Sequence, residues 1–336
     1  MKVEGYRLKV MRTLILTILL MLGVGAWAER ITFVSYNCEN LFDTQHDTLK
    51  NDTDFTPTGK YRWTPRRYRQ KLDRIGKVLV ACGGEGNDWQ MPDIAVLLEV
   101  ENSHVLRDLV YYSALKGGGY KYVITDSPDQ RGVDIAIIYS PLTMRLVASD
   151  TLRIPRKPHQ RPTRDVIHAE FLTTNGTPLH VFGIHAPSRL GGVKQTEPYR
   201  IAVVQRIVDA IGQIRKKSPE AHIVVAGDFN DYSGDRSLKL LQQCGFMEVS
   251  EKALGLHHHK AVRGTYQYQG VWESLDHILV NEPLLPQVDK CYIFDAPWML
   301  EQNKAGTLKP NRTFVGPTYH GGFSDHLPLV LRITNN

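Results

Sequence analysis

Short polar clusters in this chain each lie at one end of an apolar run, and their side chains suit one kind of chemistry. In chain order the polar residues are Asn37, Glu99, Asp134, His185, Asp228, Asn230, Asp276, Asp325 and His326. A carboxylate or amide beside a buried strand costs free energy unless it is paired, exposed or bound to a cation. Carboxylates, amides and imidazoles gathered at strand ends are the groups that metal-assisted hydrolysis of a phosphodiester uses. We therefore expect one site assembled from the ends of many strands.

Glu99 and Asn37 are the metal ligands that the residue pattern itself indicates. Glu99 directly follows the apolar run 95–98, and a carboxylate there is a hard oxygen ligand for Mg²⁺. Asn37 closes the run 31–36 and offers a neutral oxygen to the same ion. Each also has an ordinary interpretation, because a lone Glu at a strand end often forms a salt bridge and a lone Asn often forms a turn. Only the set as a whole favours a metal site.

His185, Asp228 and Asn230 end two further apolar runs, and together they could surround a phosphate group. Gly227 precedes the pair and permits a close approach of the backbone. Because side chains two positions apart point to the same side of an extended chain, Asp228 and Asn230 share one side if the strand geometry continues. The segment 227–230 is the more specific of these signals.

Two histidines each need an acceptor that fixes the tautomer of the ring if they are to act in catalysis. Asp276, which precedes the apolar run 278–280, is predicted to orient His326, and Asp134 is predicted to do the same for His185. A lone histidine is more often a packed or solvated residue. The three consecutive histidines at 257–259 lie in a polar loop without a partner pattern, so we interpret them as solvated rather than as a metal site.

Continuous apolar runs predict the strands that carry these clusters. They span residues 31–34, 94–98, 135–138, 181–184 and 223–226. Runs that are continuous rather than alternating are typical of strands buried on both faces. Residues 68–80 and 199–214 instead have apolar side chains at helical spacing, as expected of helices that cover a sheet. This mixture predicts a layered α+β architecture.

Three polar stretches predict long surface loops beside the site clusters. They span residues 43–67, 155–164 and 297–322. Long loops in a compact domain often face the substrate, and the alternative is that each is a plain insertion.

The first 28 residues have the pattern of a secretory signal. Arg12 leads into the apolar stretch 14–22, and the small residues near Ala28 place the cleavage site after it. The alternatives are an uncleaved N-terminal anchor and a translation start at Met11 rather than Met1. We expect export to the periplasm or the medium, with residues 29–336 forming a single catalytic domain. Cleavage removes four basic residues and one acidic residue, so the formal net charge falls from +6 to +3, a mild positive balance.

The four cysteines, Cys38, Cys82, Cys244 and Cys291, are too widely spaced for a compact zinc site. Three disulfide pairings are possible in an exported chain, and buried free thiols are the equal alternative. Cysteine catalysis is not expected.

Several motifs resemble those of the endonuclease/exonuclease/phosphatase superfamily, the DNase I-like enzymes, and suggest an exported bacterial member. The matching segments are 35–42, 97–102, 183–189, 227–231, 276–278 and 324–328. The resemblance covers residues 31 to 333. It implies a four-layer αββα sandwich, in which two mixed β-sheets pack face to face between helices, with the site at one edge.

The resemblance also implies a role for each site residue. Mg²⁺ or Mn²⁺ would be held by Asn37, Glu99 and Asp325. Asp228 would orient or deprotonate the attacking water with help from Asn230, and His326 and His185 would contact the phosphate or transfer a proton. Arg164 resembles a basic residue that contacts phosphate in nucleases of this group, and Arg189 belongs to the strand-end histidine motif.

Three functions follow as hypotheses. The first is an exported endonuclease that acts on DNA or RNA, as a monomer without an obligate protein partner. The second keeps the chemistry but uses a phospholipid, as in a sphingomyelinase, or a phosphorylated small molecule; the apolar segment 296–300 is its one feature for membrane contact. The third is a non-enzymatic interaction module, which predicts that a metal or proton-transfer position is missing. None is missing, so the sequence favours an enzyme.

Overall fold

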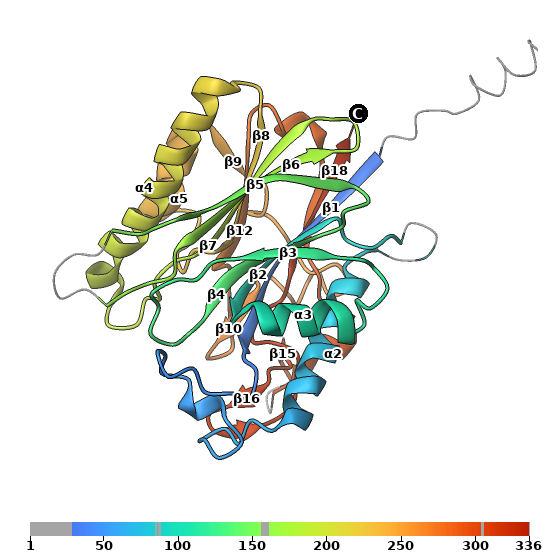
Figure 1. Cartoon of the computed structure of the whole chain (residues 1–336), viewed down its shortest axis with the longest axis vertical. Helices are drawn as coiled ribbons and strands as arrows, with labels where there is room; N and C mark the ends of the chain where they lie inside the picture. The colour runs from blue at the N-terminus through green and yellow to red at the C-terminus, as the bar shows by residue number, and fades with distance from the viewer. Residues whose placement is uncertain (1–28, 85, 87–88, 156–160, 304–305, 336) are drawn as a thin grey trace, which may run out of the picture.

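Two mixed β-sheets packed face to face form the centre of the molecule in the computed structural model (Figure 1). The structure describes residues 29–335 apart from residues 85, 87–88, 156–160 and 304–305. The predicted signal segment, residues 1–28, lies outside the described residues. Within the described part, no helix has both the length and the apolar character needed to cross a membrane.

The first sheet has six strands in the order β13-β18-β1-β2-β4-β3. Their bounds are β1 Glu29–Leu41, β2 Ile94–Val100, β3 Lys121–Ile124, β4 Asp134–Tyr139, β13 Val288–Ile293 and β18 Leu329–Asn335. The central strands β1 and β2 are parallel, and the other neighbours are antiparallel.

The second sheet has six strands in the order β5-β6-β7-β8-β12-β9. Their bounds are β5 Met144–Leu152, β6 Val166–Thr173, β7 Pro178–His185, β8 His222–Asp228, β9 Phe246–Glu248 and β12 Asp276–Asn281. Again one central pair, β7 and β8, is parallel, and its neighbours are antiparallel. Both sheets are therefore mixed, as the sequence predicted.

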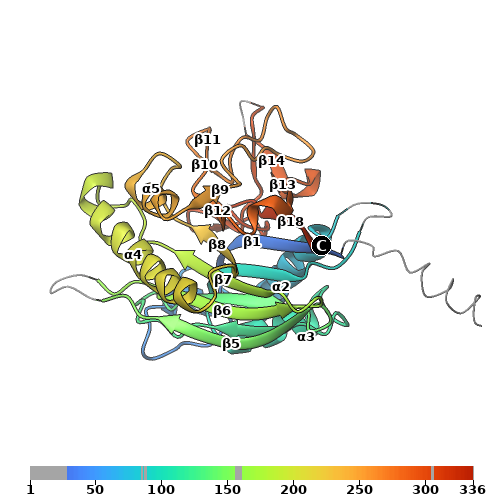
Figure 2. The same cartoon turned by 90° about the horizontal axis from the view of Figure 1, so that it is seen from above.

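Helices cover the outer face of each sheet. On the first sheet lie α2 (Pro65–Ala81) and α3 (Ser103–Tyr112), and on the second lie α4 (Val193–Lys217) and α5 (Arg236–Gln243). Figure 2 shows the two pairs on opposite sides of the strands. One apolar core fills the space between the sheets and under α2 and α3, and a second lies under α4 and α5. The predicted four-layer αββα sandwich is confirmed.

The predicted helices and strands are present, with longer bounds. The helix expected over 68–80 begins at Pro65, because the side chain of Thr64 accepts a hydrogen bond from the backbone of Arg67 and Pro65 stands at the first helical position. The helix expected over 199–214 spans Val193–Lys217. Strands β4 and β12 are buried at every position, in agreement with the continuous apolar runs.

The stretch 297–322 is more ordered than a plain loop. It contains η4 (Pro297–Met299), the antiparallel pair β14 (Leu300–Gln302) and β15 (Leu308–Pro310), and the pair β16 (Phe314–Val315) and β17 (Thr318–Tyr319). An aromatic cluster that includes Phe42, Trp63 and Phe314 ties it to the stretch 43–64, which contains η1 (Thr53–Phe55). The remaining elements are β10 (Tyr266–Tyr268), β11 (Val271–Glu273) and η3 (Leu285–Gln287).

All four cysteines are free thiols. Cys38 and Cys82 are buried in the main core, where burial raises the pKa of Cys38 to about 12 and also raises that of Cys82. The structure therefore favours free thiols over bridges, with Cys38 and Cys82 buried and Cys244 and Cys291 partly buried.

Candidate active site

The polar ends of several strands meet at one edge of the sandwich. In the second sheet, Asp228 lies opposite His185 of β7 and also opposite Asp276 of β12. From the first sheet, the side-chain amide of Asn37 lies 3.4 Å from Asp228 Oδ2 and links the two sheets. This register brings side chains that are 191 residues apart in the sequence into one site.

A β-bulge places Glu99 at this edge. The pairing of β2 shifts register between Leu98 and Val100, and Glu99 has a φ of 59°, a value that non-glycine residues seldom adopt. Its Oε2 accepts a hydrogen bond of 2.9 Å from the backbone of Asn40, which also has a positive φ of 55°. Such backbone conformations cost free energy and are held by their surroundings, often at functional sites.

Gly227 and Asn230 explain the backbone on either side of Asp228. Gly227 has a φ of 144°, and a Cβ there would lie 1.9 Å from the carbonyl oxygen of Ile184, so only glycine fits. Asn230 has a φ of 51°, so the extended geometry expected from the sequence does not continue. Instead, the backbone of Asn230 donates a 2.8 Å hydrogen bond to Asp228 Oδ1, and its side-chain amide donates to the carbonyl of Ala186 at 3.1 Å.

The structure pairs His326 with Asp276, as the sequence predicted. The Nδ1 atom of His326 lies 2.7 Å from Asp276 Oδ2, which also accepts a hydrogen bond of 2.5 Å from Thr265 Oγ1. Burial alone would lower the pKa of His326, but the charge and hydrogen bond of Asp276, followed by the charges of Asp325 and Asp228, raise it to about 10. His326 is therefore an imidazolium ion at neutral pH.

His185 is buried and does not pair with Asp134, so that prediction is wrong. Asp134 Oδ1 accepts hydrogen bonds from Thr125 Oγ1 at 2.6 Å and from the backbone of Ser127 at 2.9 Å, which makes it a brace for the 125–127 turn rather than a catalytic group. His185 Nε2 lies 3.6 Å from Asp228 Oδ2, and among the described residues its Nδ1 has no hydrogen-bond partner.

The surroundings of His185 keep its ring neutral. Burial lowers the pKa of His185 most strongly, and the positive charges of Arg164, Arg131 and His326 lower it further. The site thus contains one neutral and one charged imidazole, because only His326 has a carboxylate bonded directly to its ring.

Arg164 has a structural position, in disagreement with the expectation that it contacts substrate phosphate. Its side chain is 7% exposed, and its guanidinium donates to the carbonyl oxygens of His185 at 3.2 Å and Ala186 at 2.8 Å and to Asp129 at 3.0 Å. These bonds hold the end of β7 in place. The sequence could not show them, because two of the acceptors are backbone carbonyls and the third, Asp129, is 35 residues away.

Two arginines that the sequence analysis did not select face the site instead. Arg131 lies 3.6 Å from Glu99 Oε1 and is 49% exposed. Arg312 lies 2.7 Å from Asp325 Oδ2 and 3.3 Å from Glu39 Oε1. Each pairs with a carboxylate at the site and keeps part of its surface in solvent, so each is placed to meet an anionic substrate. Arg312 belongs to the stretch 297–322, which the sequence analysis gave as a loop that could face the substrate, without selecting a residue in it.

Arg189 lies at the rim of the site. Its guanidinium carbon is 4.3 Å from the ring centre of Tyr232, whose hydroxyl donates a 2.9 Å hydrogen bond to Glu273. Tyr232 is 37% exposed, so one aromatic surface remains open beside Asn230.

The donor set fits a hard divalent cation. Burial raises the pKa of Asp325 to about 6, and the negative charges of Glu39 and Glu99 contribute to the rise. Glu99 and Asp325 therefore repel each other across the site, and a cation shared by them and by the Asn37 oxygen would remove that repulsion. Oxygen ligands of this kind suit Mg²⁺ or Mn²⁺.

Asp228, Asp276 and His326 form a second set, with ligand atoms that all lie within 4.8 Å of one another. Because the His326 ring is charged and bonded to Asp276, this set suits proton transfer better than metal binding. Burial and the charge of Asp276 raise the pKa of Asp228 to about 7.

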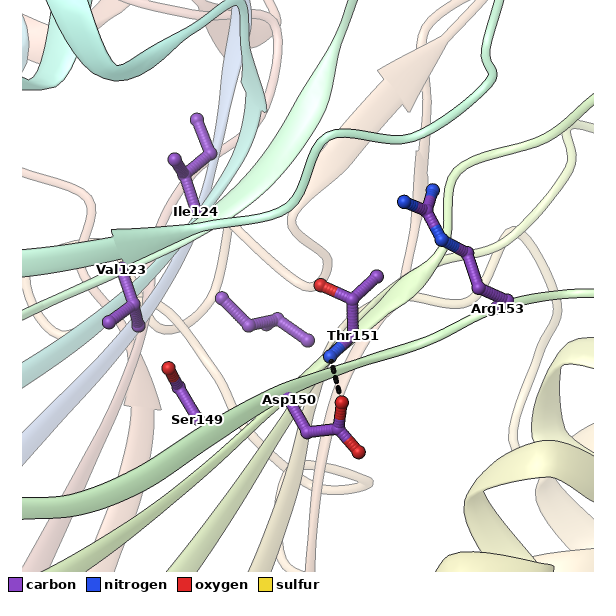
Figure 3. Close-up of a pocket in the computed structure, with 7 residues that line it drawn as sticks. Val123, Ile124, Ser149, Asp150, Thr151 and Arg153 are labelled. Carbon is purple, nitrogen blue, oxygen red and sulfur yellow. Dashed lines mark hydrogen bonds between the residues drawn. The ribbon is translucent and has the colours of Figure 1, made fainter.

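Two cavities lie outside the cluster of strand ends. One, of about 420 Å³, opens between the edge strands β3 and β5 and is lined by residues such as Val123, Ser149 and Arg153 (Figure 3). The other, of about 290 Å³, lies beside the 125–127 turn and is lined by Lys50, Glu101 and Asp134. Neither contains the His326 and Asp276 pair.

Comparison with known proteins places the fold in context. The family model described as "Endonuclease/Exonuclease/phosphatase family" matches residues 32–335. Among curated proteins, none matches the sequence.

Solved structures are similar over nearly the whole chain. A mannosyl-6-phosphatase from Bacteroides thetaiotaomicron is 18% identical with a TM-score of 0.59, covering 90% of this chain and 98% of that one. A family protein from the same organism is 18% identical with a TM-score of 0.57 (91% and 97% covered). The D. rerio protein TDP2 in complex with a single-strand DNA product is 17% identical with a TM-score of 0.53 (90% and 98% covered). At these identities the similarity establishes the fold.

Proposed function

Since the chain belongs to the endonuclease/exonuclease/phosphatase family, we propose that it is an exported, divalent-metal-dependent hydrolase of the phosphodiester bonds of nucleic acid. The family makes it a phosphoester hydrolase, and the choice of nucleic acid and of export goes beyond that. The observation that carries the proposal is the convergence of Asp228, Asp276 and His326 within 4.8 Å, next to the separate oxygen ligands Glu99 and Asp325.

The charge state of each site residue determines its role in the proposed reaction. Asn37, Glu99 and Asp325 would hold Mg²⁺ or Mn²⁺, which when bound neutralises charge on the phosphate and on the leaving oxygen. Asp228 accepts the proton of the attacking water, because its raised pKa of about 7 makes it a stronger base than an ordinary aspartate.

His326 supplies the positive charge on the other side of the reaction. Asp276 holds its Nδ1–H, so the Nε2–H is the proton available to the phosphate or the leaving oxygen. The neutral His185 lies beside Asp228 Oδ2 and completes the wall of the site. Arg131 and Arg312 would contact the phosphate oxygens that the metal does not.

A comparison of substrates tests this proposal. Protein beginning at Glu29 is assayed with Mg²⁺ or Mn²⁺ on plasmid DNA, RNA and bis-p-nitrophenyl phosphate, each with and without EDTA. We expect cleavage of nucleic acid that EDTA stops and that Asp228→Ala abolishes. Asp150→Asn, an exposed aspartate on the edge strand β5, is the matched control and should retain full activity. Intact nucleic acid in every arm would contradict the proposal.

A phosphatase that acts on a phosphorylated sugar or another small molecule is the second candidate. The observation that favours it is the rim group of Arg189, Tyr232 and Glu273, because an open aromatic face beside a carboxylate suits a sugar ring. A similar fold belongs to the mannosyl-6-phosphatase. Faster hydrolysis of a sugar 6-phosphate than of nucleic acid would move the assignment to this class. Sphingomyelin in a further arm tests the lipid alternative.

A further inference from the structure

A row of basic side chains runs along one face of α2. The helix contains six basic residues and one acidic residue, and Arg66, Arg67, Arg74 and Lys77 recur at a spacing that places them on the same side. Arg66 and Lys77 are exposed, and Arg67 and Arg74 are half-buried. In the part of the chain that the structure describes, none of the four forms an ion pair with a carboxylate, whereas Arg131 and Arg312 at the site both do.

Aromatic rings support this row from below. The Arg67 guanidinium lies 4.2 Å from the ring centre of Tyr319, and Lys77 Nζ lies 4.2 Å from that of Trp298. Arg74 lies 5.3 Å from the ring of Phe323. Burial raises the pKa of Tyr319, and the positive charges of Arg74, Arg67 and Arg66 oppose that rise. Cations held over rings keep their charge for an outside partner.

The start of α2 is also unfavourable for arginine. The N-terminus of a helix carries a partial positive charge, so basic residues in the first turn cost stability rather than add to it. The first turn of α2 contains Arg66 and Arg67 and no acidic residue. Positive charge is therefore concentrated here although it destabilises the helix. An approaching anion would be attracted both by the arginines and by the partial positive charge of the helix N-terminus.

The row leads directly to the active site. Tyr319 of β17 pairs with Phe314 of β16, and the backbone just before Phe314 carries Arg312, which bonds Asp325. Lys71 of α2 donates a 2.6 Å hydrogen bond to Thr313 Oγ1 and so joins the helix to this hairpin. The face of α2 is thus joined to the reaction centre through this hairpin and Arg312.

We propose that the basic face of α2, formed by Arg66, Arg67, Arg74 and Lys77, binds the phosphodiester backbone of a polynucleotide next to the phosphate being cleaved. This inference rests on the proposed function. A helix rises about 1.5 Å per residue, so the face spans about 17 Å, close to the length of about five phosphates of one duplex strand. A small diester bound at the reaction centre is too short to extend to this face.

A membrane surface is the less suitable partner. The three aromatic rings under the row are covered by the cations, and none of the exposed large apolar side chains lies on α2. Insertion of apolar side chains between lipids therefore has no support at this face.

The variant Arg66→Gln/Lys77→Gln removes two exposed charges, and the contact it removes is the one between Lys77 and the Trp298 ring. The control Lys216→Gln/Lys217→Gln removes two exposed charges from the last turn of α4, on the other sheet. Binding of fluorescein-labelled 20-nucleotide single strands and 20-base-pair duplexes is followed by anisotropy in EDTA over a series of NaCl concentrations. Hydrolysis of bis-p-nitrophenyl phosphate with Mn²⁺ is measured in parallel.

We expect the α2 variant to bind about 10-fold or more weakly at 0.1 M salt, and the slope of log K against log salt to become shallower by about 1.4 for single strands or 1.8 for duplexes. Its hydrolysis of the small diester should equal that of the wild type, and the α4 variant should match the wild type in every assay. The larger of the two binding losses identifies the form of nucleic acid.

Equal binding by the wild type and the α2 variant, with hydrolysis intact, would overturn this inference and leave the proposed function in place. Absence of hydrolysis by the wild type would instead overturn the proposed function. A binding loss seen only with phosphatidylserine vesicles would assign the face to membranes and also overturn the inference. Arg66→Glu/Lys77→Glu provides a second variant, which should weaken oligonucleotide binding further, and an unchanged melting temperature shows that the fold is intact.

Discussion

Replacing Asp276 by Asn should move both limbs of the pH–rate profile toward acid. Under the proposed mechanism, activity requires a charged His326 and an ionised Asp228, so it rises as pH passes the pKa of Asp228, about 7, and falls as pH passes that of His326, about 10. Asp276 bonds the His326 ring at 2.7 Å and also contributes its charge to the raised pKa of Asp228. One substitution therefore affects both groups.

The size of the expected shift follows from the groups that surround His326. Its pKa of about 10 lies about 3.5 units above the ordinary value of 6.5, which corresponds to about 5 kcal/mol in favour of the imidazolium ion. Burial acts in the opposite direction, so neighbouring acids supply all of this, and Asp276 is the largest contributor. Loss of one adjacent charge lowers such a pKa by about 1–3 units. For Asp276→Asn we therefore expect the alkaline limb of the profile near pH 8 and its acid limb below pH 7.

The assay is kcat for bis-p-nitrophenyl phosphate between pH 5 and 11 at a fixed Mn²⁺ concentration. Asp150→Asn serves as the control for loss of one negative charge far from the site. In metal-free protein, an NMR titration of the His326 ring, assigned with His326→Gln, provides a readout that does not depend on turnover. The two limbs belong to a coupled set of groups, so the shifts are compared between variants rather than assigned to single residues.

A variant that loses activity uniformly, with both limbs at their wild-type positions, would refute the reasoning. Asp276 would then act only through the packing of its strand. An NMR titration of His326 unchanged by Asp276→Asn would lead to the same conclusion.

Three further predictions concern stability and substrate affinity. Asp228→Asn should raise the melting temperature in EDTA at pH 8, with the gain disappearing near pH 4, because a carboxyl whose pKa is raised to about 7 in the folded state destabilises that state as pH rises from about 4 to 7. Arg164→Gln should lower the free energy of unfolding in urea by about 2–4 kcal/mol, since it removes three hydrogen bonds to buried acceptors, of which the Ala186 carbonyl keeps a second donor in Asn230, while the KM for the small diester changes less than about twofold. Arg131→Gln and Arg312→Gln should each raise that KM about 10-fold, and an unchanged KM would remove them from the substrate site.

The order of the site residues and the elements that carry them followed from the sequence alone. A continuous apolar run predicts a strand buried on both faces, and the hydrogen-bonded geometry of that strand fixes where its last residue lies. Asp228 could be placed at the end of its strand for this reason and Asp276 at the start of its own, whereas Asn37 lies within β1, which continues to Leu41. The pairing of Asp276 with His326 was also predictable, because both belong to strands or strand ends that the motifs already placed at one edge.

Other parts of the site depend on contacts that no local pattern records. The bulge at Glu99 and the left-handed backbone of Asn230 arise from the way neighbouring segments pack around them, so the condition that the extended geometry continues through 228–230 is not met. The partner of Asp134 proved to be its own 125–127 turn, since a short side chain bonds the nearest donors before it reaches across a sheet.

The arginines show most clearly the difference between what the sequence predicts and what only the tertiary structure determines. Sequence order identified Arg164 as a loop residue near the site, but its position under β7 directs the guanidinium to buried carbonyls. Arg131 and Arg312 reach the site because the two sheets and the 297–322 stretch close around it. A sequence determines which residues end its strands, through periodicity and hydrogen bonding along the chain. Only the folded structure determines which long, flexible side chains meet there, because that depends on packing between segments hundreds of residues apart.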